Sequence, residues 1–299
     1  MSVPDVPARS AGVIHDLGFR HYDGPRLGRR QVVRALFVES TRGAYGLGRS
    51  TRSKIMPFLL LAAVTLPALV VAVVLNVTGT ASLGIGYAAY PISVLPLLSL
   101  YVAGQAPALV SRDLRFRVVT LYFSRPLRRE DYVRAKLAAL ACATAVLTCL
   151  PVLVLYAGAL LAQLPFWAQT RAAAVGLLGC LLLSMLLAGI ALVIAAVTPR
   201  RGLGVAAVIT VLVMLTAVQG ILQALGQDQG NAGLEHWSGL LSPFTLVSGL
   251  QRWAFDAPLE DLPDPPGALG GWVYLAVALA VLAGSYALLV LRYRRVSVS

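Results

Sequence analysis

Six long apolar segments constrain the fold of this chain more than any other feature of its sequence. They are residues 55–77, 87–110, 137–161, 172–197, 203–225 and 272–291. A helix needs roughly 20 apolar residues to cross a hydrocarbon core about 30 Å thick. Lipid offers no hydrogen bonds to the backbone, so a crossing segment that stands alone must be helical. The sequence therefore predicts an all-α integral membrane protein with six transmembrane helices.

The composition agrees with this class. The chain is 58% hydrophobic and 13% charged, whereas a soluble domain carries about 25% charged residues. The formal net charge of +12 is compatible with nucleic-acid binding, but the basic residues lie at the edges of the apolar segments. That distribution is the one that membrane insertion produces, so we expect a lipid bilayer and no nucleic acid as a partner.

The basic residues also predict the orientation. Of the 25 lysines and arginines, 23 lie in residues 1–54, 111–136, 198–202 and 292–299, which are on one side of a six-span chain. All four tryptophans fall on the other side. Lysine and arginine accumulate on the cytoplasmic side of membrane proteins, and the first 54 residues hold no signal-peptide-like apolar run. Arginine also outnumbers lysine 23 to 2, as in GC-rich bacterial genomes. We predict cytoplasmic N- and C-termini and a multi-pass protein of the bacterial cytoplasmic (inner) membrane.

The chain divides into a cytoplasmic N-terminal part, residues 1–54, and a six-span domain, residues 55–299. Within the first part, residues 29–46 predict an amphipathic helix lying in the membrane interface. Its apolar face is formed by Val32, Val33, Leu36 and Phe37. An ordinary solvated helix is the alternative. The following GAYGLGRS, residues 43–50, resembles a Walker A loop but lacks its lysine, and we interpret it as a glycine elbow.

Two segments depart from a simple crossing helix. Residues 87–110 contain Pro91, Pro96 and Pro107, which predict a kinked or broken helix. Residues 234–255 are apolar but are interrupted by glycine and proline. We expect this second segment to form short re-entrant helices on the outer side, between the fifth and sixth spans.

Residues for chemistry within the membrane are scarce in this sequence. No Asp, Glu, Lys, Arg or His lies inside a predicted span, and ion-coupled carriers usually need such groups. The three histidines are dispersed, and the three cysteines lie in apolar runs. We therefore expect no cofactor or metal bound by this chain and no enzymatic activity. A membrane enzyme or scaffold acting alone, or an ion-coupled secondary carrier, remains the alternative to a transport protein driven by a partner.

The connector, defined as residues 111–136, carries eight lysines and arginines between the second and third apolar segments. We predict a helix at 113–123, with Asp113 near its start. One apolar face holds Leu114, Val118, Leu121 and Tyr122. The second holds Phe116, Val119 and Phe123, flanked by Arg112 and Arg115. A short helix with two apolar faces needs two partners, and the arginine-flanked face suits a groove on a cytoplasmic protein. A basic loop that touches anionic lipid is the alternative.

The run RDLRFRVVTLYFSRPLRREDYVRAK resembles the segment of ABC-2 type transporter permeases that leads from the second span to the third. The positions that carry the resemblance are Asp113, Thr120, Leu121, Pro126, Arg128 or Arg129, Tyr132 and Lys136. Val119 departs from it, because members often have glycine there. HYDGPRLGR at 21–29 and SPF at 242–244 resemble other parts of the family.

The resemblance implies the permease subunit of a bacterial ABC exporter. Such a subunit would form a dimer with a second copy or a paralogue, and two separate ATPase subunits would bind ATP and Mg. Residues 29–46 would be the connecting helix. The coupling helix would dock on the ATPase through Arg112, Asp113, Arg115, Phe116, Val119 and Phe123. The expected cargo is a drug, a lipid or another amphipathic molecule.

Overall fold

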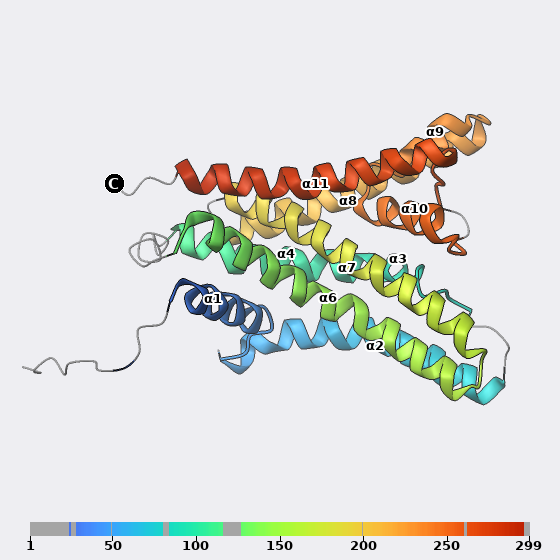
Figure 1. Cartoon of the computed structure of the whole chain (residues 1–299), viewed down its shortest axis with the longest axis horizontal. Helices are drawn as coiled ribbons and strands as arrows, with labels where there is room; N and C mark the ends of the chain where they lie inside the picture. Colours follow the sequence, from blue (N-terminus) through green and yellow to red (C-terminus); the bar gives the residue numbers. More distant parts are fainter. Residues whose placement is uncertain are drawn as a thin grey trace, which may run out of the picture.

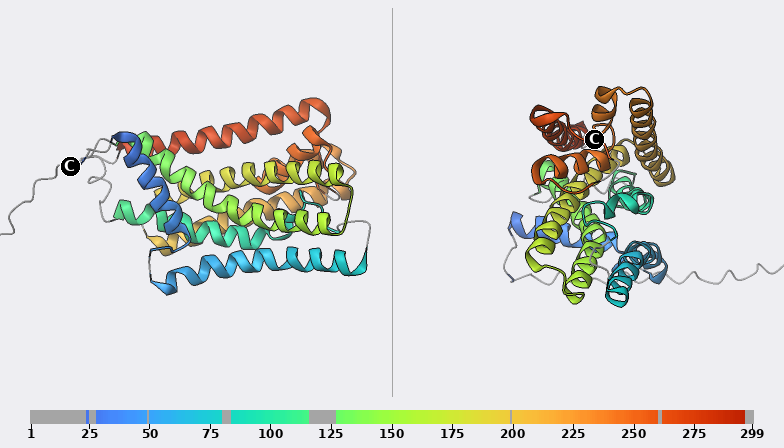
Figure 2. Two further views of the ribbon diagram at one scale, coloured as in Figure 1. Left: turned by 60° about the horizontal axis from the view of Figure 1, so that its bottom comes forward. Right: turned by 90° about the vertical axis from the view of Figure 1, so that its right-hand side faces the viewer.

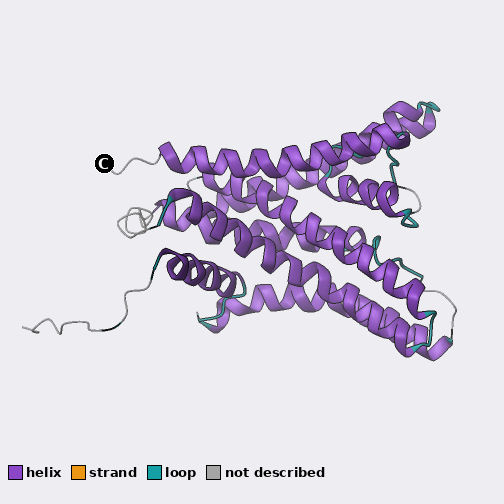
Figure 3. Ribbon diagram, in the orientation of Figure 1, coloured by secondary structure: helices purple, strands orange, loops and turns teal. Residues whose placement is uncertain are grey.

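The part of the chain that the structure describes is helical throughout and has no strand (Figure 3). This computed structural model describes residues 24, 28–48, 50–79, 84–115, 127–198, 200–259 and 262–295. The helices in these ranges are α1 (Arg29–Ala44), α2 (Thr51–Thr78), α3 (Tyr90–Ser93), α4 (Leu95–Arg115), α6 (Arg129–Leu161), α7 (Phe166–Val197), α8 (Arg201–Asp228), α9 (Ala232–Ser238), α10 (Pro243–Phe255) and α11 (Gly267–Arg295). The all-α prediction is confirmed for these residues.

Five helices are long and apolar enough to cross a membrane: α2, α6, α7, α8 and α11. The chain is therefore a multi-pass membrane protein by the length and hydropathy of its helices. The predicted second span differs, because it is divided at Val94 into α3 and α4. Pro91 and Pro96 are each the second residue of a helix, a position where the missing N–H leaves no intrahelical bond unmade. The prediction of a broken segment is confirmed, and among the described residues α4 contributes the apolar stretch Leu95–Ser111.

The helices form a bundle in which successive long helices run in opposite directions (Figure 1). α2, α6 and α8 run one way, and α4, α7 and α11 run back. Seen from the side and from the end, α6 and α7 lie between α2 and α11 (Figures 1 and 2). α7 and α6 are also the most enclosed of the five long helices, and α8 is the least enclosed.

Charge and tryptophan separate along this bundle. The basic end, defined by residues 29–54, 128–136, 200–201 and 292–295, gathers α1 with the starts of α2, α6 and α8 and the end of α11 (Figure 1). Trp167, Trp237, Trp253 and Trp272 belong to helix turns at the other end, which we call the tryptophan end. Tryptophan favours the membrane–water interface, so the two ends have the composition of two different membrane surfaces.

Small residues let α2 approach α6 closely. A Cβ placed on Gly158 of α6 would lie 2.4 Å from the Cβ of Ala72 in α2. Asn76 of α2 donates from Nδ2 to the Gly158 carbonyl oxygen at 3.0 Å. Van der Waals packing through small residues and hydrogen bonds between helices hold membrane bundles together, because lipid supplies no hydrophobic drive between them.

Short helices are present in the predicted region 234–255: α9, which begins slightly earlier at Ala232, and α10. α10 packs against α7 and α11 and is buried from Pro243 to Gln251. Gln251 donates from Nε2 to the Val175 carbonyl oxygen of α7 at 2.9 Å. Tyr274 of α11 lies against Gly249 and donates to the His236 carbonyl. These bonds join the segment to the bundle interior at the tryptophan end.

The glycine-rich segment at 43–50 ends α1 and turns the chain into α2. Gly46 has φ +67° and Gly48 has φ +82°, a region that only glycine enters without strain. A Cβ on Gly46 would lie 2.4 Å from the Ser53 carbonyl oxygen. The turn that we predicted from these glycines is confirmed.

Candidate functional site

The candidate site is the protein surface at the basic end from which the connector leaves and to which it returns. α1 lies across the bundle at this end (Figure 2) and packs against α6 and, less extensively, against α4. Leu36 is buried, and Val32, Val33 and Phe37 are partly buried against the core. A helix is present at Arg29–Ala44 within the predicted range, and its four apolar residues contact the bundle. Its position in the membrane interface stays a prediction.

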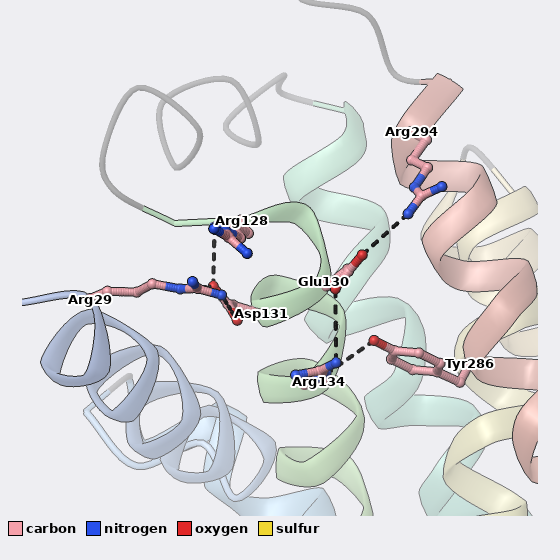
Figure 4. A network of polar contacts seen from close by, with 7 residues as sticks. All are labelled: Arg29, Arg128, Glu130, Asp131, Arg134, Tyr286 and Arg294. Atoms are coloured by element: carbon pink, nitrogen blue, oxygen red, sulfur yellow. Dashed lines mark hydrogen bonds and ion pairs between the residues drawn. The ribbon is translucent and has the colours of Figure 1, made fainter.

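Asp131 joins the first turns of α1 and α6 (Figure 4). Its carboxylate accepts hydrogen bonds from Arg29 Nε at 2.6 Å and Arg29 Nη2 at 2.8 Å. It also accepts the backbone N–H of Arg128 at 3.2 Å, where a negative charge suits the helix N-terminus. The Asp131 side chain is only 9% exposed, whereas that of Arg29 is 42% exposed. The hydrogen bond to Asp131 raises the pKa of Arg29 above its ordinary value.

Glu130 and Arg134 link the same turn of α6 to α11 (Figure 4). Glu130 Oε1 lies 3.2 Å from Arg294 Nη2, and Glu130 Oε2 lies 3.8 Å from Arg134 Nη2. Arg134 donates from Nε to the Tyr286 hydroxyl at 3.0 Å. These groups are exposed, so each ion pair contributes about 0–1 kcal/mol. They therefore define the geometry between α6 and α11 more than they stabilise the fold.

Beneath this polar layer an aromatic contact joins the same two helices. Tyr132 is fully buried, and its ring meets the Tyr293 ring edge-on with centroids 5.0 Å apart. Lys136 Nζ lies 5.5 Å from the centroid of the Tyr132 ring. Tyr132 and Lys136 are two of the positions that carry the family resemblance. Tyr132 packs between α6 and α11, and Lys136 lies over the Tyr132 ring within α6.

Three of the six predicted coupling residues belong to the described part of the chain, which pauses after residue 115, and three do not. Arg112, Asp113 and Arg115 belong to α4, which is still helical at Arg115. Asp113 is therefore not in the first turn of a separate helix, because α4 continues past the predicted start. Phe116, Val119 and Phe123 lie in 116–126, outside the described residues.

Both ends of the connector are anchored in the bundle. On the α4 side, the buried Ser111 hydroxyl donates to the Ala195 carbonyl oxygen of α7 at 3.1 Å. On the α6 side, Leu127 is buried, and Asp131 is tied to α1. Ser111 and Asp131, on the two sides of this stretch, are therefore held to different helices, α7 and α1.

Sequence analysis did not find the Arg29–Asp131 contact. Asp131 lies in the first turn of α6, where a negative charge is favourable. Its partner, however, is 102 residues away in a different helix. No local pattern encodes that distance, and Arg29 is one of ten basic residues in the first 54.

A hollow lies at the tryptophan end. It measures about 420 Å³ and is lined by residues of α7, the chain before α3, and the chain after α10, including Tyr87, Gln169, Arg171 and Asp256. The Tyr87 hydroxyl donates to Gln169 Oε1 at 2.7 Å. Among the described residues, no three or more His, Cys, Asp or Glu side chains are grouped to hold a metal ion.

No protein-family model matches the chain, and no curated protein matches it. The structure establishes a helical protein with five helices that could cross a membrane, and the family must be argued from the residues.

Proposed function

We propose that this protein is the permease subunit of an ATP-driven exporter of the ABC-2 type. Two copies, or one copy and a paralogue, form the translocation pathway, and two separate ATPase subunits supply the energy. The cargo is a drug, a lipid or another amphipathic molecule. This chain performs no catalysis, and ATP and Mg are bound by the partner.

In this proposal the chain crosses the membrane six times. After α2 and before α6 in the sequence, α3 and α4 together return the chain from the tryptophan end to the basic end (Figure 1). With that crossing included, α1 and the end of α11 both lie at the basic end, which the positive-inside rule assigns to the cytoplasm. α9 and α10 then form the re-entrant pair on the outer side.

One observation carries the proposal: the connector is fixed at both ends to different helices of the bundle. Ser111 bonds to α7, while Asp131 and Glu130 bond to α1 and α11. An ATPase that binds the connector would therefore move several helices together, each as a rigid body. Such movements between packed states are a common basis of switching.

ATP binding would draw the two ATPase subunits together and move the two connectors with them. α4 and α6 would then tilt relative to α7 and α11, and the pathway would change from inward-open to outward-open. ATP hydrolysis in the partner would reverse the movement. The predicted contact is the arginine-flanked apolar face of the connector, which contains Phe116.

The test is purification of the full-length protein from its host, followed by identification of co-purifying ATP-binding cassette subunits and assay of ATP turnover in proteoliposomes. We expect a stable complex whose turnover rises with transported substrate. The double variant Arg115→Ala/Phe116→Ala should lose both the complex and the stimulation. Arg200→Gln/Arg201→Gln, which removes two charges from the same end, should keep both.

Three results would replace the proposal. Intact complex and turnover in the Arg115→Ala/Phe116→Ala variant would show that the ATPase docks elsewhere. Gradient-driven uptake in membranes without an ATPase would make the protein a secondary carrier. Substrate conversion by the isolated chain would make it a membrane enzyme.

A further inference from the structure

A groove runs between α1 and α6 at the basic end. It measures about 560 Å³. On the α1 side it is lined by Arg30, Val33, Arg34 and Phe37, together with Arg29. Positions 30, 33, 34 and 37 follow the three- and four-residue spacing of one helix face, and Arg29 borders that face.

The groove has a strong excess of positive charge. Arginines 29, 30, 34 and 134 line it, and Asp131 is its one acidic residue, so the formal excess is three positive charges. Arg29 is bound to Asp131, and Arg134 is bound to Glu130 and Tyr286. Arg30 and Arg34 form no ion pair with any residue of the described ranges. Like charges at i and i+4 destabilise a helix, and an anion between them would reverse that effect.

The rest of the groove is apolar. Val33 and Phe37 come from α1, and Ala135 and Ala138 come from α6. Ala138 lies just inside the apolar stretch of α6 that begins at residue 137, whereas Arg134 lies just before it. The groove therefore changes from charged to apolar where the apolar stretch of α6 begins, in the same order as the headgroups and acyl chains of a bilayer.

We propose that this groove binds an anionic phospholipid. Its phosphate would lie between Arg30 and Arg34, and its glycerol and upper acyl chain would lie along Phe37 and Ala138. Basic pockets beside membrane helices bind anionic headgroups in this way, and cytoplasmic leaflets are rich in such lipids. The apolar wall distinguishes a lipid from free phosphate, which would leave that wall unfilled. The proposal does not rest on the transport function.

The experiment uses the full-length protein in detergent and counts retained lipids by native mass spectrometry. The probes are phosphatidylglycerol and phosphatidylcholine with identical acyl chains. We expect one phosphatidylglycerol to be retained in preference to phosphatidylcholine. Arg30→Gln/Arg34→Gln should weaken this retention about tenfold. Arg200→Gln/Arg201→Gln, with the same charge change at the same end, should retain it as the wild type does.

Each alternative has its own result. Equal losses in the two double variants would mean that the basic end attracts lipid diffusely. Displacement of the lipid by millimolar inorganic phosphate would mean a free-anion site. Equal retention of the two lipids would overturn the proposal outright. A thermal melt of each variant separates lost binding from lost folding, and Arg30→Lys/Arg34→Lys should restore much of the preference.

Discussion

Arg29 and Asp131 are 102 residues apart in the sequence and form a two-bond ion pair between the first turns of α1 and α6. Bidentate pairs of arginine with a carboxylate fix orientation as well as distance. The pair therefore sets where α1 sits on the bundle. It also closes one side of the groove that holds Arg30 and Arg34.

Loss of Arg29 should destabilise the protein more than its own exposure suggests. Arg29→Ala removes two of the three hydrogen bonds that the Asp131 carboxylate accepts, so we expect a lower melting temperature. Asp131→Asn should cost less, because it removes the unpaired charge along with the ion pair. Thermal unfolding in detergent measures both. A charge exchange, Arg29→Asp with Asp131→Arg, should recover part of the loss, and equal stability of Arg29→Ala and wild type would contradict the assignment.

Gly158 of α6 lies in close contact with Ala72 of α2, so Gly158→Ala should destabilise the bundle. The new Cβ would fall 2.4 Å from that of Ala72, and overpacking of a close contact costs about 1–3 kcal/mol. Gly220→Ala in α8 is the matched control, because open space surrounds its Cβ. It should be neutral or stabilising by up to about 1 kcal/mol. The compensating Ala72→Gly should restore Gly158→Ala, and the melting temperature in detergent reports each case.

The sequence predicts the long helices well, because about 20 consecutive apolar residues have few alternatives in lipid. It also predicts the broken segment at 87–110, since Pro91 and Pro96 fix helix starts. It does not predict that the break falls at Val94, with α3 before it and α4 after it.

The candidate site was less accessible from the sequence. The apolar face of α1 follows from periodicity, but its packing on α6 depends on a contact far away in the chain. Asp131 and Glu130 are recognisable as helix-start residues, whereas their partners Arg29 and Arg294 are two among 23 arginines. Periodicity identifies which face of a helix is buried, and only the fold identifies what it meets.

Gln251 should anchor α10 to α7 through its bond to the Val175 carbonyl. Gln251→Leu keeps the volume approximately but leaves that carbonyl without this donor, and we expect a loss of about 1 kcal/mol. Gln229→Leu is the control, since Gln229 is exposed at the end of α8. Proteolysis of the chain around 256–267 should quicken only in the first variant. Equal protease resistance would mean that α10 is held by packing alone.

The ion pair between Glu130 and Arg294 should matter for movement more than for stability. Both side chains are exposed, at 42% and 59%, so Glu130→Gln should change the free energy of unfolding by less than about 1 kcal/mol. Under the proposed function, it should reduce the ATP turnover that substrate stimulates, because α6 would be less firmly linked to α11. The exchange Glu130→Arg with Arg294→Glu should restore the stimulation. If Glu130→Gln instead lowered the free energy of unfolding strongly and left the stimulated ATP turnover normal, the ion pair would serve stability and not movement.

The orientation of the bundle can be tested directly with single cysteines. Ser50→Cys lies at the basic end before α2, and Asp256→Cys lies exposed at the tryptophan end after α10. Both belong in a background in which Cys142, Cys149 and Cys180 are replaced by alanine. We predict that the basic end faces the cytoplasm. A membrane-impermeant maleimide added to intact cells should therefore label Asp256→Cys and should label Ser50→Cys only after permeabilisation. The opposite pattern would place the connector outside the cell, where no ATP-driven partner could reach it.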